Sequence, residues 1–326
     1  MGDAMASTLR SAAVTVLLAL TTRAFAQPVE PPPPEPPAPP APDIAKPDPG
    51  AKPEDVQHAE DVAKKAALTP IIPSPNNATQ PAFQLYAEID LPIMAVGTVF
   101  ALARLTKVQP AYCAPTCDKS TLTGILGSLD KATAGYYSAG WSTASDFALY
   151  GLGAAGLALL VADEGVLNTL NDAVVVLEAT LSATAVASIM TLAAGRPRPF
   201  LYGDPTNPSS YKAPESVRNS ADAGLSFLSS HTAMAFAITT SLAVTERRLH
   251  PGSPAGKIVL GVGLAVSSFV ALARVESGYH FVTDVVGGAI VGSSLGWMIS
   301  SIHNSPVHVV PVVSDKGAGV GLSGSF

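Results

Sequence analysis

The chain has 326 residues, of which 48% are hydrophobic and 13% are charged, whereas soluble proteins average about 25% charged residues. This composition is compatible with membrane insertion, and the length suits one large domain with tails. The formal net charge of -6, with no stripe of Lys and Arg, argues against nucleic-acid binding.

The N-terminal region has the pattern of a secretory signal. Arg10 precedes an apolar stretch at 12–20, and Ala24-Phe25-Ala26 forms an A-x-A cleavage site, so residues 1–26 are predicted to be a signal peptide. An uncleaved anchor helix is the alternative, although the apolar core is short for a membrane span of roughly 20 residues. In both cases the chain that follows is expected to be exported to the cell envelope.

Residues 27–68 are predicted to form a Pro-rich linker that ends in a short solvated helix. Prolines crowd residues 28–53, and because proline excludes regular helix and sheet, this segment is expected to be an extended polyproline II tether. Such a segment fits a spacer in an envelope compartment.

Cysteine occurs only twice, at Cys113 and Cys117. In an exported loop this pair is expected to form a local disulfide, with two free thiols as the alternative because so short a loop depends on geometry. A metal site would need further ligands nearby, and the sequence around the two cysteines offers none.

Apolar segments separated by polar breaks make up most of the remaining chain. They predict an all-α domain over residues 69–305, a bundle of about six apolar helices that is expected to be membrane-embedded. A soluble bundle is the alternative, because several segments are shorter than about 20 residues and Glu178 lies inside one of them. Gly288, Gly292 and Gly296 predict a close-packing helix face. The six segments are 91–105, 147–162, 173–194, 232–244, 258–273 and 285–302.

The tail, residues 306–326, alternates apolar and small residues around Asp315-Lys316-Gly317 and is a possible hairpin.

Three clusters of polar residues stand at the ends of these apolar segments. They are Gly195-Arg196-Pro197-Arg198-Pro199, then Phe227-Leu228-Ser229-Ser230-His231-Thr232, then the stretch from Arg274 to Asp284. In the last, His280 and Asp284 are four residues apart and would share one helix face. A carboxylate there can hold one imidazole nitrogen protonated and leave the other as a nucleophile or base. Arg274 can bring a guanidinium fork to an anion.

In these residues the chain resembles the type-2 phosphatidic acid phosphatase and vanadium haloperoxidase superfamily. The three family motifs read Lys, six residues, Arg-Pro; then Pro-Ser-Gly-His; then Ser-Arg, five residues, His, three residues, Asp. The matching residues, in the same order, are Arg198-Pro199, Ser229 with His231, and Arg274, His280 and Asp284. The departures are Thr191 for Lys, Leu228 for Pro, Ser230 for Gly and Ala273 for Ser. One phosphate-binding cation is therefore missing unless Arg196 or Lys212 replaces it.

The resemblance implies phosphoryl transfer without a metal or another cofactor. It implies that His280 attacks phosphorus to give a phosphohistidine, that Asp284 orients His280, and that His231 protonates the leaving oxygen and later activates water. The residues expected to bind phosphate are Arg198, Arg274, Ser229, Ser230 and Arg196. For Ser229 a helix N-cap is the other interpretation, and for Arg196 the role of a neighbour only.

The expected function is hydrolysis of a phosphate monoester or diphosphate, with a lipid phosphate in or near the membrane as substrate. The loop from Tyr202 to Gly224 carries no motif that specifies the headgroup. Two alternatives remain: a vanadate-dependent haloperoxidase, in which vanadate takes the place of phosphate, and a non-catalytic anion-binding pseudoenzyme of the envelope, which the four departures support.

The orientation expected in the membrane follows from the loop charges. Arg247, Arg248 and Lys257 predict a cytoplasmic loop, which places the motifs on the periplasmic or exterior face of an inner membrane. A cleaved signal followed by three full spans before Arg198 would instead deliver the motifs to the cytoplasm. We therefore expect either that the segment 91–105 does not cross the membrane or that the bundle lies wholly outside it.

Overall fold

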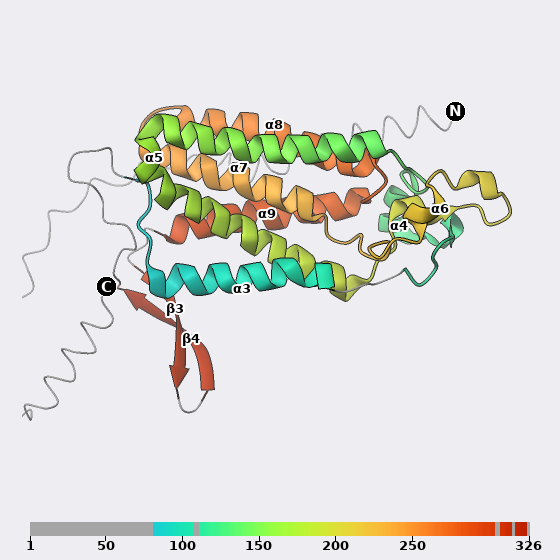
Figure 1. Ribbon diagram of the computed structural model, residues 1–326, viewed down its shortest axis with the longest axis horizontal. Helices are drawn as coiled ribbons and strands as arrows, with labels where there is room; N and C mark the ends of the chain where they lie inside the picture. The colour runs from blue at the N-terminus through green and yellow to red at the C-terminus, as the bar shows by residue number, and fades with distance from the viewer. Residues whose placement is uncertain (1–80, 107–110, 304–306, 315–316, 325–326) are drawn as a thin grey trace, which may run out of the picture.

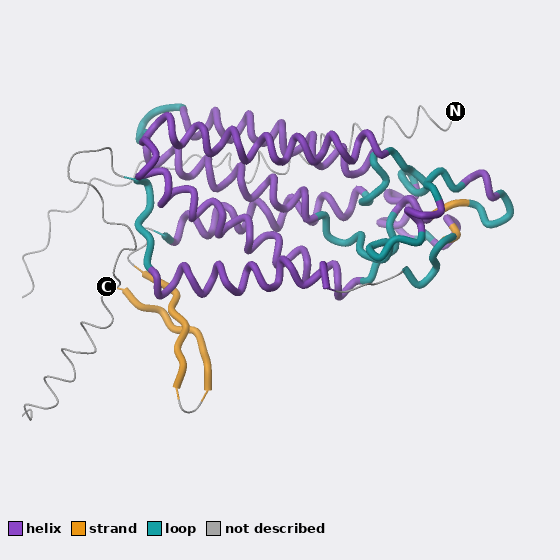
Figure 2. Tube along the Cα trace, viewed as in Figure 1, coloured by secondary structure: helices purple, strands orange, loops and turns teal. Residues whose placement is uncertain are grey.

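A computed structural model describes residues 81–106, 111–303, 307–314 and 317–324 (Figure 1). The predicted signal peptide and Pro-rich linker lie outside these residues. Within them the chain is predominantly helical, as the apolar segments predict (Figure 2).

The long helices lie lengthwise in one bundle (Figure 1). They are α3 (Ala87–Thr106), α5 (Ala139–Ala194), α7 (Ser230–Leu249), α8 (Ala255–Glu276) and α9 (Val282–Ile302). Two of the six predicted helices are the two arms of α5, because Gly165 has a φ of 75° and turns the chain back on itself. Glycine takes this left-handed conformation at little cost. The prediction of an all-α bundle of apolar helices is confirmed, with two of the six joined at a bend.

Helix α7 occupies the centre of the bundle and packs against α5, α8 and α9. Its residues from Ser230 to Glu246 are mostly small and mostly buried. A Cβ on Gly292 would collide with the carbonyl of Ala233, and one on Gly296 with the side chain of Thr240. The predicted glycine face of the last helix therefore forms its contact with α7.

The outer faces of the surrounding helices carry large exposed apolar side chains, among them Val99 on α3, Phe147 on α5, Val262 on α8 and Trp297 on α9. Helices α5, α8 and α9 are long and apolar enough to cross a membrane. Because water disfavours so much exposed apolar surface, this pattern supports the membrane-embedded bundle over the soluble one.

Helix α3 runs alongside α5 for the length of the bundle (Figure 1). It begins at the end where α5 bends and finishes at the end where the three motifs lie. It is not among the described helices that are long and apolar enough to cross a membrane, so the expectation that residues 91–105 do not cross stays a prediction.

Loops and short elements cover the end of the bundle that holds the motifs. They are β1 (Cys117–Asp118), α4 (Gly124–Lys131), β2 (Tyr202–Gly203), α6 (Glu215–Arg218) and 3₁₀ turns at Lys119–Thr121, Pro199–Leu201 and Pro208–Ser210. Strands β1 and β2 pair in parallel, with Cys117 opposite Tyr202.

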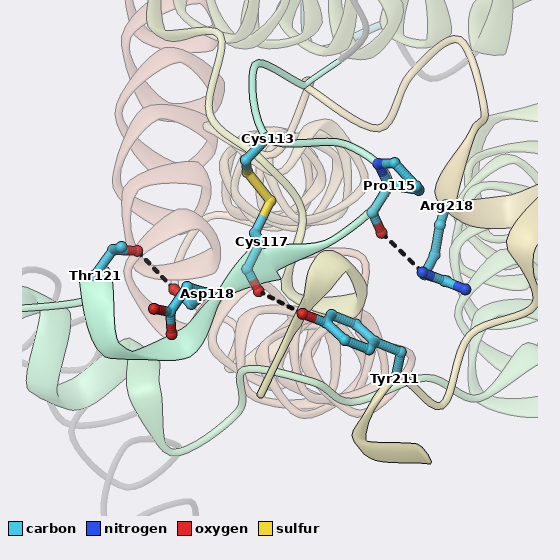
Figure 3. Close-up of a disulfide and its surroundings, with 7 residues drawn as sticks. All are labelled: Cys113, Pro115, Cys117, Asp118, Thr121, Tyr211 and Arg218. Carbon is cyan, nitrogen blue, oxygen red and sulfur yellow. Dashed lines mark hydrogen bonds between the residues drawn. A yellow bond between two sulfur atoms is a disulfide. The ribbon is translucent and has the colours of Figure 1, made fainter. Parts of the chain in front are cut away.

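A disulfide joins Cys113 to Cys117 in this covering layer, with a Cα–Cα distance of 5.0 Å (Figure 3). Tyr211 donates a hydrogen bond to the carbonyl of Cys117, and Arg218 donates one to the carbonyl of Pro115 at 3.0 Å. Of the two states expected for the cysteines, the structure has the disulfide.

Beyond α9, β3 (Val307–Ser314) and β4 (Gly317–Gly324) form an antiparallel hairpin with Val307 opposite Gly324. It falls within the tail at 306–326 and leaves the bundle where α9 ends (Figure 1).

Candidate active site

The three polar clusters of the sequence meet at the loop-covered end of the bundle. The first cluster begins at Gly195, which ends α5 with a φ of 54°, the second begins α7, and the third joins α8 to α9. Gly278 takes a φ of 75° in that last turn, and a Cβ there would collide with the carbonyl of Tyr136. Only glycine fits this position, so the turn that presents His280 depends on it.

His280 is buried in the turn between α8 and α9, and its Nδ1 lies 2.6 Å from the carbonyl oxygen of Ser226. A carbonyl oxygen can only accept, so Nδ1 carries the proton and Nε2 keeps its lone pair. Burial, together with the positive charges of Arg198 and Arg274, lowers the pKa of His280 well below its usual value of 6.5. The imidazole is therefore neutral at pH 7, which is the state a nucleophile needs.

Asp284 supports His280 through an intermediate residue. Its Oδ2 is 4.0 Å from His280 Nδ1, and the same oxygen accepts hydrogen bonds from Ser226 Oγ at 2.5 Å and from the Phe281 N–H at 2.9 Å. The carboxylate thus holds Ser226, and the Ser226 carbonyl holds His280. The sequence predicts direct orientation of His280 by Asp284, and the structure places Ser226 between them.

Two buried arginines lie over the ring of Tyr279. The ring centroid of Tyr279 is 4.9 Å from Arg198 Cζ and 4.7 Å from Arg274 Cζ. Arg198 also donates to the Tyr279 carbonyl at 2.9 Å and to the Asp222 carboxylate at 2.8 Å. Cation–π contacts and hydrogen bonds therefore hold two guanidinium forks close to His280, an arrangement suited to binding an anion.

Arg274 is further positioned by the first turns of α5. It donates to Ser142 Oγ at 3.3 Å and Ser145 Oγ at 3.2 Å, and its Nη1 lies 3.9 Å from Asp146 Oδ1. The motif arginine is thus anchored by residues more than 120 positions away in sequence.

His231 faces Asp146, with 2.9 Å between Nε2 and Oδ1. A carboxylate accepts, so Nε2 carries a proton, and any transfer to a substrate must go through Nδ1. Both side chains are partly exposed, 21% for His231 and 42% for Asp146, whereas that of His280 is 3% exposed. Solvent therefore reaches the site from the side of His231.

Arg196 is engaged by carboxylates. It donates to Asp130 Oδ2 at 2.5 Å, to Asp284 Oδ1 at 2.6 Å and to Thr283 Oγ1 at 2.8 Å, and its Cζ stacks 4.2 Å from the ring centroid of Phe281. These contacts favour the interpretation of Arg196 as a neighbour that braces Asp284. Lys212 is exposed, with Nζ 5.3 Å from the ring centroid of Tyr136.

The two serines of the second cluster lie at the start of α7. Ser229 is its N-cap, accepting from the Thr232 N–H at 3.4 Å and from Thr232 Oγ1 at 2.9 Å, and Ser230 is the first, buried residue of the helix. A helix N-terminus next to two arginines favours an anion.

A family model, that of the PAP2 superfamily, matches residues 172–306. This region of the chain is thus similar to the PAP2 superfamily, the family whose motifs the sequence resembles. The match contains all three motifs and runs from the second arm of α5 to the end of α9. Searches of curated proteins and of solved structures each found no match.

At the PAP2 lysine position, Thr191 is fully buried and donates to the carbonyls of Ala187 at 2.7 Å and Leu228 at 3.2 Å. The two cations expected to replace the missing lysine have other contacts, since Arg196 binds carboxylates and Lys212 lies over the ring of Tyr136. The positive charge beside His280 comes from Arg198 and Arg274.

Several residues that contact the side chains of the site carry no signal in the sequence. Asp146 and Asp130 precede the PAP2 region, and Ser226 and Asp222 lie in a loop without a motif. A single polar residue with no fixed spacing to a motif gives no signal. Tyr279 lies inside the third motif, although nothing in one sequence distinguishes a residue that holds the arginines from one that only packs.

Proposed function

We propose that this PAP2-like protein is a phosphatase that hydrolyses a phosphate monoester or diphosphate through a phosphohistidine at His280. The observation that carries the proposal is a neutral, buried His280 whose Nδ1 is tied to the Ser226 carbonyl, beside two arginines held in place. Phosphoryl transfer requires a nucleophile, positive charge around the phosphoryl oxygens and a proton for the leaving group.

Each requirement has a residue in the site. His280 Nε2 attacks phosphorus while the bond to the leaving oxygen breaks, and His231 gives that oxygen its proton. Water then attacks the phosphohistidine, His231 takes a proton from it, and the P–N bond breaks to release inorganic phosphate and neutral His280. Arg198 and Arg274 hold the phosphoryl oxygens, and their guanidinium groups supply the charge stabilisation without a metal ion at phosphorus.

A lipid phosphate is the proposed substrate class because the site lies at one end of an apolar bundle. Helices with exposed apolar side chains surround α7, and the polar site begins where those helices end. A substrate with its chains in the bilayer and its phosphate at the interface would meet His231 first, since His231 is the more exposed histidine.

We further propose that the site faces the cell exterior. The Cys113–Cys117 disulfide lies at the site end, and disulfides persist in oxidising compartments, whereas Arg247, Arg248 and Lys257 lie at the opposite end. If all six helical segments cross one bilayer, this orientation starts α3 on the cytoplasmic side. A signal peptide cleaved after Ala26 starts it on the outside, so the two expectations exclude each other in that arrangement. Labelling with an impermeant maleimide, before and after reduction of intact cells, decides the orientation.

The function is tested with the purified full-length protein in detergent, assayed on phosphatidate, a prenyl diphosphate and p-nitrophenyl phosphate with and without chelator. His280→Ala should abolish turnover and remove the acid-labile phosphoenzyme. The matched control is His250→Ala, because His250 lies at the other end of α7. Undiminished activity of the His280→Ala protein would refute the mechanism.

The same preparation separates the alternatives. Halide oxidation by peroxide after addition of vanadate, without phosphatase activity, would assign the haloperoxidase. Binding of phosphate or lipid phosphate without turnover of any substrate would assign the pseudoenzyme.

A further inference from the structure

A second cluster of ionisable side chains lies in the bundle, away from the motifs. Asp90 comes from the first turn of α3, Glu178 from the second arm of α5, and His303 caps the C-terminus of α9. Their exposed fractions are 1%, 0% and 8%. Three helices thus contribute one buried ligand-type side chain each, and the proposed phosphatase mechanism uses none of them.

The distances within this triplet match those between ligands of one metal ion. His303 Nε2 lies 3.3 Å from Asp90 Oδ1 and 3.2 Å from Glu178 Oε2. With metal–ligand bonds of about 2.1 Å, neighbouring ligand atoms are separated by roughly 3.0 Å in octahedral and roughly 3.4 Å in tetrahedral geometry. Both observed separations fall between these values, and the three donor atoms all lie within 4.8 Å of one another.

Nε2 of His303 lies within ion-pair distance of both carboxylates, but hydrogen bonds of ordinary geometry do not link the triplet. Across the described residues, neither carboxylate oxygen of Glu178 nor Nε2 of His303 has a hydrogen-bond partner of acceptable geometry, although all three atoms are buried. Leaving a buried carboxylate without such a partner is costly, and a bound cation removes that cost.

The outer contacts of the triplet hold its ligand atoms in place. His303 Nδ1 lies 3.0 Å from the carbonyl of Ile299, so Nδ1 donates its proton there and Nε2 is the nitrogen turned to the carboxylates. The second oxygen of Asp90 accepts from the Tyr86 N–H at 2.6 Å. Metal-binding histidines usually donate their other ring N–H to a carbonyl or carboxylate in this way.

We propose that Asp90, Glu178 and His303 bind one divalent first-row transition metal ion. One imidazole nitrogen with two carboxylate oxygens suits such an ion better than Ca²⁺ or Mg²⁺, which prefer oxygen ligands only. The ion would balance both carboxylates and tie α3 to α5 and α9. It would act on the stability of the bundle and leave the chemistry at His280 metal-free.

Two other charged side chains lie against Phe83, whose ring contacts His303. Arg248 stacks on Phe83 with Cζ 4.8 Å from the ring centroid, and the Asp172 carboxylate accepts from the N–H groups of Ala82 at 2.9 Å and Phe83 at 3.0 Å. The Phe83 ring lies edge-on to His303, at 5.9 Å between centroids.

A second triplet, Asp163, Glu246 and His250, provides a matched control. His250 Nε2 already forms a hydrogen bond to Asp163 Oδ2 at 3.1 Å, and its side chain is 41% exposed. An ordinary hydrogen bond explains this contact.

The test uses untagged full-length protein in detergent, stripped with chelator. Zn²⁺ and Mn²⁺ are titrated by isothermal calorimetry, and bound metal is counted by mass spectrometry after gel filtration. We expect one Zn²⁺ per chain, weaker Mn²⁺ binding, and a loss of affinity of roughly 100-fold in Glu178→Gln and in His303→Gln, with no change in His250→Gln. Retained phosphatase activity or a monodisperse gel-filtration peak reports that each variant is folded.

A measurement on the wild-type protein covers the case in which the variants do not fold. X-ray absorption at the zinc edge should show one imidazole nitrogen and otherwise oxygen ligands. A wild-type protein that holds no stoichiometric metal would overturn the proposal and leave an imidazolium ion between two carboxylates. Binding that survives in both Glu178→Gln and His303→Gln, or that is lost in His250→Gln instead, would also overturn it.

Discussion

Replacing Asp284 with asparagine separates two ways in which this carboxylate can serve His280. A direct contact would make Asp284 part of the chemical step. The structure instead puts 4.0 Å between Asp284 Oδ2 and His280 Nδ1 and inserts Ser226 between them. We therefore expect Asp284→Asn to weaken the fold strongly and the chemistry modestly.

The magnitude follows from the three hydrogen bonds that the carboxylate accepts. Asp284 is fully buried and receives Arg196 on one oxygen, and Ser226 and Phe281 on the other. An amide presents oxygen on one side only, so its NH₂ group must face a donor in either orientation. Breaking a buried ion pair costs about 3–5 kcal/mol, a large part of a total stability of about 5–15 kcal/mol. The Ser226 carbonyl stays in the backbone, so we expect kcat to fall only about 10- to 100-fold.

The assay combines thermal denaturation in detergent with kinetics at a temperature where the variant is folded. Asp130→Asn is the matched control, because Asp130 binds the same arginine at 2.5 Å and contacts Thr283 rather than Ser226. It should lower Tm with little effect on kcat. The reasoning is refuted if Asp284→Asn keeps its Tm while kcat drops as far as it does in His280→Ala.

Three further predictions concern the behaviour at acid pH, the two arginines beside Tyr279, and the disulfide in the loops that cover the site. Because the pKa of His280 is lowered well below 6.5, kcat/KM should stay level as the pH falls through 6.5, and a pH–rate profile that drops tenfold per unit from 6.5 contradicts this. The same shift makes the unfolded chain bind a proton that the folded chain does not, so stability is present above pH 6.5 and is lost as the pH falls below it. Tyr279→Leu should lower kcat/KM about 10-fold by releasing both arginines, whereas Tyr279→Phe should keep it, and equal kinetics of the two variants would exclude the cation–π role. Replacing Cys113 and Cys117 with serine should cost about 2 kcal/mol for so short a loop, and an unchanged Tm would contradict it.

The helices could be predicted because each apolar segment is long enough to be recognised as a helix. The bend in α5 could not be predicted, because residues 163–172 contain several polar side chains and this pattern indicates a break between two helices. Those side chains are used over long range: Asp172 receives the N–H groups of Ala82 and Phe83, and Asn171 donates to the Phe83 carbonyl at 3.3 Å. A polar stretch that binds a distant backbone reads locally as a loop.

The central residues of the site were predicted from the resemblance to the three family motifs, whose residues lie at helix ends that the structure brings together. The residues that hold these side chains in place could not be predicted. Asp146 meets His231 across 85 positions, and the backbone of Ser226 meets His280 across 54. The first contact has no fixed spacing to a motif, and the second uses a backbone carbonyl that any residue at 226 offers.

Two departures from the PAP2 pattern, Thr191 and Leu228, lie in contact in the structure. The Thr191 hydroxyl donates to the Leu228 carbonyl, and the Leu228 side chain packs into the buried cluster with Ala187 and Ala233. A lysine at 191 would bring an ammonium group into this apolar contact, where an unpaired charge is costly. The absence of a lysine is therefore compatible with the buried surroundings of residue 191. His280 and the two arginines beside Tyr279 are retained, which is why we propose an enzyme rather than a pseudoenzyme.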